Sequence, residues 1–129
     1  MKTLLWLDDY RDPFDKNIDW LVFSPIGKDV NIIWVKSYQE FCNYLDNNSM
    51  PDAICFDHDL GQEVIGNFVE KNGYDCAKFL VEKSISTKGK LPKYASQSSN
   101  PVGRENIISY LDNFVKINPE YRPVDSSEQ

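Results

Sequence analysis

The sequence has few cysteines and a single histidine, His58. Cys42, Cys55 and Cys76 are an odd number at wide spacings, and each lies within a hydrophobic pattern. Such spacing fits neither a disulfide framework nor a paired metal-binding motif. We therefore expect three reduced core cysteines in a cytosolic protein.

Basic residues and long apolar runs are also scarce. Fourteen lysines and arginines face 20 acids, for a net charge of -6. This balance disfavours attraction to polyphosphate backbones and anionic membranes, so we expect neither a broad nucleic-acid groove nor a membrane partner. The opening apolar run, residues 4–7, is too short for a signal peptide, and no later run approaches a membrane span. We expect a soluble, cytoplasmic protein of open oligomeric state.

The composition that remains is that of one globular domain. The chain has 129 residues, of which 41% are apolar and 26% charged. A chain of this size buries roughly two-thirds of its unfolded surface, which is enough for one core. We predict a domain over residues 1–118, followed by a loosely ordered tail over residues 119–129, where no strand pattern occurs.

Short apolar runs alternate with helix signals along the domain. Strands are predicted at residues 4–7, 32–35, 53–56 and, more weakly, 91–95. Helices are predicted to begin after the capping residues Ser37, Asn72 and Asn100, the last with Pro101 at the first helical position. This alternation predicts an α/β fold with a parallel sheet of order 2-1-3-4 and helices on both faces.

Acidic residues follow two of the predicted strands. Asp8 and Asp9 come directly after the first strand, and Asp57 and Asp59 come after the third. In the predicted sheet these strands are neighbours about 4.8 Å apart, so the carboxylates would repel one another without compensation. Oxygen ligands at an open site favour Mg²⁺ or Mn²⁺. The alternative is that the aspartates only end strands and cap turns.

Other polar residues near these strand ends are candidates for substrate contact. His58 is a candidate catalytic or metal-binding residue, because imidazole, with an unperturbed pKa of about 6.5, suits proton transfer; a structural hydrogen bond is an equal alternative. A phosphate seat is predicted from Ser96, Ser98, Ser99 and Asn100 ahead of a helix, although capping alone also explains them. Arg11 and Arg104 are candidate phosphate clamps or ordinary surface residues. The segment from Gln62 to Lys71 is a candidate lid.

Four motifs in this order resemble a known family. They are Leu5-Trp6-Leu7-Asp8-Asp9 with Arg11 and Pro13, Phe56-Asp57-His58-Asp59-Leu60-Gly61, Gly73-Tyr74-Asp75, and Asn100-Pro101-Val102-Gly103. Together they resemble the cyclic-phosphate processing receiver domains, a divergent branch of the receiver superfamily. The resemblance covers residues 1 to about 115. It implies a receiver-like (flavodoxin-like) parallel sheet of four to five strands.

The resemblance also implies roles for particular residues. In ordinary receivers a pair like Asp8-Asp9 holds Mg²⁺, an aspartate like Asp57 accepts a phosphoryl group, and a lysine ends a fifth strand. No apolar run follows the last predicted helix, so we expect the fifth strand and its lysine to be lost. The divergent branch is inferred to hydrolyse cyclic phosphates of RNA repair or ADP-ribose metabolism. Where its pattern often carries a histidine and a serine, this chain has Gln97 and Ser98.

The leading hypothesis is a metal-dependent phosphodiesterase that opens a small cyclic phosphate or nucleotide. Asp8, Asp9, Asp57 and Asp59 would hold Mg²⁺ or Mn²⁺, and Asp57 and His58 would be catalytic. The substrate-binding residues would be Arg11, Ser96, Ser98, Asn100 and Arg104. One alternative is a signalling receiver phosphorylated at Asp57. The other is a module that binds a nucleotide without turnover.

Overall fold

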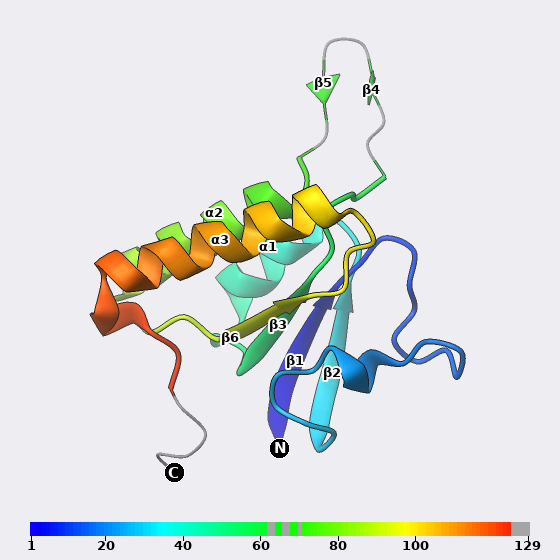
Figure 1. Ribbon diagram of the computed structural model, residues 1–129, viewed down its shortest axis with the longest axis horizontal. Helices are drawn as coiled ribbons and strands as arrows, with labels where there is room; N and C mark the ends of the chain where they lie inside the picture. Colours follow the sequence, from blue (N-terminus) through cyan, green and yellow to red (C-terminus); the bar gives the residue numbers. More distant parts are fainter. Residues whose placement is uncertain (62–63, 66–67, 70, 125–129) are drawn as a thin grey trace.

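The computed structural model describes residues 1–61, 64–65, 68–69 and 71–124. Its main sheet is parallel and contains four strands, in the order β2-β1-β3-β6 (Figure 1). The strands are β1 (Lys2–Leu7), β2 (Val30–Val35), β3 (Ala53–Phe56) and β6 (Lys93–Ser96). The predicted α/β class and the predicted strand order 2-1-3-4 are confirmed.

Three α-helices begin at the predicted capping residues. They are α1 (Tyr38–Asn47), α2 (Gly73–Thr87) and α3 (Pro101–Ile117). At each helix start, a side-chain oxygen accepts a hydrogen bond from a backbone amide of the first turn. Ser37 accepts from Glu40, Asn72 from Asp75 and Asn100 from Gly103. Such caps satisfy amides that have no partner within the helix. Among the described residues, no helix has both the length and the apolar character that crossing a membrane requires.

The main core lies between one face of the sheet and all three helices. Because side chains alternate along a strand, Leu5, Leu7, Ile54 and Phe56 all point to this face. They pack against buried residues of the three helices, including Phe41, Leu80 and Ile107. Figure 1 shows α1, α2 and α3 on the same side of the sheet.

The opposite face is covered by a loop in place of α-helices. Leu4, Trp6, Ala53 and Cys55 lie on this face and pack against Ile18, Trp20, Ile26 and neighbouring strand residues. The covering loop, residues 8–29, contains a single turn of 3-10 helix, η1 (Trp20–Val22). Prolines and a glycine at positive φ interrupt this loop, which prevents a longer helix. The prediction of helices on both faces is therefore correct for one face only, because the other face is covered by a loop with one 3-10 turn.

A small hairpin occupies the segment that was predicted as a lid. Strands β4 (Val64–Ile65) and β5 (Phe68–Val69) pair antiparallel in a separate two-stranded sheet. Figure 1 shows this hairpin beyond the carboxyl ends of the main strands. Residues 62, 63, 66, 67 and 70 of the predicted lid lie outside the described residues.

Residues directly after the predicted domain boundary at residue 118 contact the domain. A second 3-10 turn, η2 (Pro119–Tyr121), follows α3, and the amide of Leu91 donates to the carbonyl of Tyr121 at 2.9 Å. The rings of Phe114 and Tyr121 are 5.2 Å apart. The predicted tail is therefore attached to the domain at its start, and residues 125–129 lie outside the described part. From residue 118 to residue 124 the chain forms no strand.

The three cysteines are free and buried, as predicted. Burial raises the pKa of Cys55 to about 12 and also raises the pKa of Cys42 and Cys76. A buried thiol with a raised pKa is a poor nucleophile. These residues therefore act as packing groups.

Candidate functional site

Three carboxylates meet at the carboxyl ends of two neighbouring strands. Asp8 and Asp9 directly follow β1, and Asp57 directly follows β3. Because β1 and β3 are paired in parallel, their ends lie side by side at one edge of the sheet. One carboxylate oxygen from each residue lies within 4.8 Å of the others. The convergence predicted for these three acids is therefore present.

Asp8 is the most constrained of the three. It is 1% exposed, and its Oδ1 accepts hydrogen bonds from the amides of Tyr10 and Arg11 at 3.0 and 2.8 Å. Its Oδ2 accepts from the side-chain amide of Gln97 at 3.3 Å. These three N–H donors fix the orientation of the carboxylate while the other two acids remain more open.

Asp57 carries a strongly perturbed acidity. Partial burial, and then the charges of Asp8 and Asp9, raise the pKa of Asp57 to about 7. The amide of His58 donates to its Oδ1 at 2.9 Å and opposes this shift only in part. Near neutral pH the cluster therefore favours either a proton or a cation, because close like charges disfavour full ionisation.

The donor set fits a hard divalent cation. Three carboxylates offer only oxygen ligands, which Mg²⁺ and Mn²⁺ accept, and a cation would relieve the repulsion that raises the pKa of Asp57. Asp59 was predicted as a fourth ligand but lies outside this group of three. Its side chain is 64% exposed and accepts hydrogen bonds from His58 and Asn100 at 2.9 and 3.3 Å. The bond from His58 is the main cause of a lowered pKa at Asp59.

The acids open onto a cavity of about 390 Å³. Its lining residues are Asp8, Asp9, Tyr10, Arg11, Asp57, Asp59, Gly61 and Ser99. A cavity of this size is at the lower end of the range for small-molecule sites. Gly61 is required here, because its φ is +60° and an added Cβ would be 3.0 Å from Asp9 Oδ2.

His58 lies beside this cavity and is absent from its lining. Its ring packs on α3, where a Cβ added to Gly103 would be 2.3 Å from His58 Cγ. Its Nδ1 is 2.9 Å from Asp59 Oδ1. The predicted proton-transfer residue therefore reaches the cavity only through Asp59.

Three residues of the predicted phosphate seat before α3 form hydrogen bonds with nearby backbone groups. Ser96 Oγ donates to the carbonyl of Phe56 at 2.7 Å, and Ser98 Oγ accepts from the amide of Asn100 at 3.1 Å. Asn100 caps α3 and Ser98 accepts within the turn before it, so the capping alternative describes these two residues, whereas the Ser96 hydroxyl links β6 to β3. The serine that lines the cavity is Ser99, which belongs to the predicted phosphate seat but is not among the five predicted substrate-binding residues. Its sequence signal is its place in the polar run Ser96-Gln97-Ser98-Ser99, directly before the cap at Asn100.

The two candidate arginines have different positions. Arg11 lines the cavity, and its guanidinium donates to the backbone carbonyl of Gln97. Arg104 is not among the lining residues, and it donates to the carbonyl of Ser98 at 3.2 Å. Arg11 is therefore placed to contact a ligand, whereas Arg104 stabilises the turn before α3.

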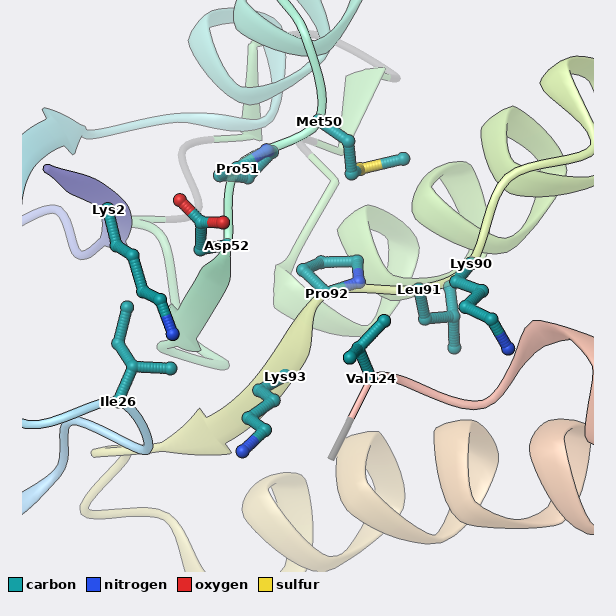
Figure 2. Close-up of a pocket in the computed structure, with 10 residues that line it drawn as sticks. All are labelled: Lys2, Ile26, Met50, Pro51, Asp52, Lys90, Leu91, Pro92, Lys93 and Val124. Atoms are coloured by element: carbon teal, nitrogen blue, oxygen red, sulfur yellow. The ribbon is translucent and has the colours of Figure 1, made fainter. Parts of the chain in front are cut away.

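A second cavity of about 350 Å³ lies at the amino-terminal ends of the strands, opposite the acidic cavity. Lysines 2, 90 and 93 line it, together with Asp52, which accepts the amide of Thr3 at 2.7 Å. Figure 2 shows Lys90 on the far side of Pro92 from Lys2 and Asp52, so the ammonium groups do not converge on one point. The acidic cavity is therefore the better candidate for chemistry.

Fold and site together define a receiver-like α/β domain with an acidic pocket at the carboxyl ends of its strands. Residues 3–113 match the family model described as the cyclic-phosphate processing receiver domain. The chain belongs to this family.

Among solved structures, one similar chain is a fusion of the yeast Spc42 trimeric coiled coil, amino acids 181–211, to another structure. The TM-score is 0.54 at 18% identity, over 90% of this chain and 73% of that one. At such identity the likeness supports the fold alone. None of the curated proteins matches the sequence.

Proposed function

We propose that this protein is a metal-dependent phosphodiesterase that hydrolyses a small cyclic phosphate, of the RNA-repair or ADP-ribose type. The observation that carries the proposal is the meeting of Asp8, Asp9 and Asp57 within 4.8 Å. In a family of cyclic-phosphate processing domains, such a cluster suits a site that handles phosphate through a cation.

Asp8, Asp9 and Asp57 would hold Mg²⁺ or Mn²⁺. When bound, the cation supplies positive charge to phosphate oxygens and activates water as a nucleophile. The chain contributes the orientation of the ligands, because the amides of Tyr10 and Arg11 and the side chain of Gln97 fix Asp8. A ligand held in one rotamer loses less entropy on binding.

Arg11 and Ser99 are the donors available to the phosphate. Both line the cavity, and a guanidinium has five N–H groups, of which one contacts the Gln97 carbonyl. The remaining N–H groups of Arg11 suit the geometry of phosphate oxygens. Ser99 adds a hydroxyl from the loop that precedes α3.

The reaction also requires a proton for the leaving alcohol. Water adds to phosphorus, one ring P–O bond breaks, and the released oxygen takes a proton to give a phosphomonoester. Asp59 lines the cavity and accepts a hydrogen bond from His58 at 2.9 Å. We assign proton delivery to this His58–Asp59 pair, because an imidazole ring can both donate and accept a proton.

The proposal is tested by incubating the protein with Mg²⁺ or Mn²⁺ and a panel of cyclic phosphates. The panel includes 2',3'-cyclic nucleotides and ADP-ribose 1'',2''-cyclic phosphate, with products followed by mass spectrometry. We expect a phosphomonoester product that is lost in Asp57→Asn. The matched control is Asp29→Asn, an exposed aspartate just before β2 at the opposite sheet edge, which should keep full activity.

Two other outcomes would replace the proposal. Labelling of Asp57 by a small phosphodonor, with every cyclic phosphate left intact, would indicate a signalling receiver. Thermal stabilisation by a nucleotide that is recovered unchanged would indicate a binding module, because a ligand that binds only the native state raises stability.

A further inference from the structure

Tyr10 is the least buried aromatic residue beside the acidic cavity. Tyr10 is 88% exposed, and it lines the same cavity as the three clustered acids. In the described part of the chain, the ring forms no aromatic pair and no cation–π contact. The fold therefore does not use this ring for packing.

The backbone around Tyr10 is nevertheless held in place. The amides of Tyr10 and Arg11 both donate to Asp8 Oδ1, at 3.0 and 2.8 Å. The indole of Trp6 donates to the carbonyl of Arg11 at 2.9 Å. The ring thus projects from a fixed turn at the rim of the cavity. An aromatic side chain on a fixed backbone loses little conformational entropy when a ligand covers it.

The neighbouring groups indicate what would cover it. Under the proposed function, a cation held by the three acids places phosphate oxygens beside them, and Tyr10 lines the same cavity. The part of a ligand next to its phosphate therefore meets a flat, exposed ring. Aromatic rings stack on the planar bases of nucleotides, whichever base is present.

We propose that Tyr10 is a stacking platform for the base of a nucleoside cyclic phosphate. The substrate class is then a base-bearing cyclic nucleotide, in which the base lies close to the cyclic phosphate. The inference rests on the proposed function for the location of the phosphate. Because stacking requires only a flat ring, the site accepts several bases with similar affinity.

The test compares two ligands, a nucleoside 2',3'-cyclic phosphate and glycerol 1,2-cyclic phosphate, which has no base. Binding is measured by calorimetry with Mg²⁺ and turnover by mass spectrometry, for the unmodified protein and for Tyr10→Ala and Tyr10→Phe. We expect Tyr10→Ala to weaken nucleotide binding roughly 5- to 100-fold. Glycerol cyclic phosphate should bind the unmodified protein and Tyr10→Ala with equal affinity. Tyr10→Phe should keep the preference for the nucleotide.

Phe14→Ala is the matched control, because Phe14 is 66% exposed and does not line the cavity. It should change neither ligand's affinity. Turnover without any Tyr10-dependent preference for the base would overturn this inference and leave the proposed function standing. A Tyr10-dependent preference for the nucleotide without turnover would support this inference and overturn the proposed function. Equal effects of Tyr10→Ala on both ligands, or no binding of either, would also overturn it.

Discussion

The side-chain amide of Gln97 donates hydrogen bonds to Asp8 Oδ2 at 3.3 Å and to the carbonyl of Leu7 at 2.9 Å. Gln97 follows β6 and Asp8 follows β1, and β3 lies between these strands. The amide therefore extends across the end of the sheet at the acidic pocket. Gln97 is 2% exposed, and its Oε1 has no partner among the described residues. Its role depends on being a donor toward a carboxylate.

Gln97→Glu should destabilise the protein, because a carboxylate of the same shape cannot donate to Asp8. At neutral pH a buried, uncompensated charge costs about 3 kcal/mol or more. The loss should grow with rising pH, since the introduced carboxyl group can still donate while it is protonated. Urea unfolding at pH 5 and pH 8 in chelator measures both effects.

Gln97→Met is the control for this prediction, because methionine removes the same donors and adds no charge. Its loss should be about 1–3 kcal/mol and nearly independent of pH. If the glutamate variant is as stable as the methionine variant at pH 8, the donor role of Gln97 is wrong.

Asp57 should make the metal-free protein less stable as pH rises. Its pKa is raised from 3.8 to about 7, so the native state binds a proton more tightly than the unfolded chain does. Between about pH 4 and pH 7 the unfolded state loses its proton first, and stability therefore falls with pH. Asp57→Asn should remove most of this slope, as measured by thermal unfolding in chelator. Asp59 lies outside the three-acid group, so Asp59→Asn should keep the slope.

The strand ends and helix caps were predictable because they depend on neighbours in the chain. Asp8, Asp9 and Asp57 follow apolar runs, and Asn72 and Asn100 precede helices, so local pattern and strand order place them correctly. The positions of other side chains depend on contacts distant in sequence. His58 is turned toward Gly103 because α3 packs there, and no local pattern around residue 58 indicates that contact.

The same limit explains the second face of the sheet. No local pattern in residues 11–29 indicates that Ile18, Trp20 and Ile26 cover Trp6 and Cys55 in place of a helix. Gln97 was noted only as a departure from the family pattern. Its contact with Asp8, 89 residues away in the chain, depends on the three-dimensional arrangement of β1 and β6.

Mg²⁺ or Mn²⁺ should stabilise the protein more at pH 8 than at pH 5. Ligating carboxylates must be deprotonated, and protons compete with the cation for Asp57 at the lower pH. At a cation concentration 100 times the Kd, the free energy of unfolding should rise by about 2.7 kcal/mol. Thermal unfolding with and without cation measures the shift. A shift of the same size in Asp57→Asn as in the parent would contradict the three-acid site.

Gly103 should be intolerant of alanine, although alanine is normally the better helix former by about 1 kcal/mol. A Cβ at this position would be 2.3 Å from His58 Cγ and 2.8 Å from His58 Cβ, so the ring cannot avoid it by rotating its far end. We expect Gly103→Ala to cost about 1–3 kcal/mol by overpacking. The double variant Gly103→Ala/His58→Ala should recover most of this loss, because it removes the ring that the new methyl group meets. Gly89→Ala is the control, since its Cβ would lie 3.5 Å from Thr87 Oγ1, an ordinary contact. Denaturant unfolding is measured for all four variants, including His58→Ala alone, and gives the coupling free energy between residues 58 and 103. If the losses of the two single variants simply add in the double variant, His58 does not pack on α3 as described.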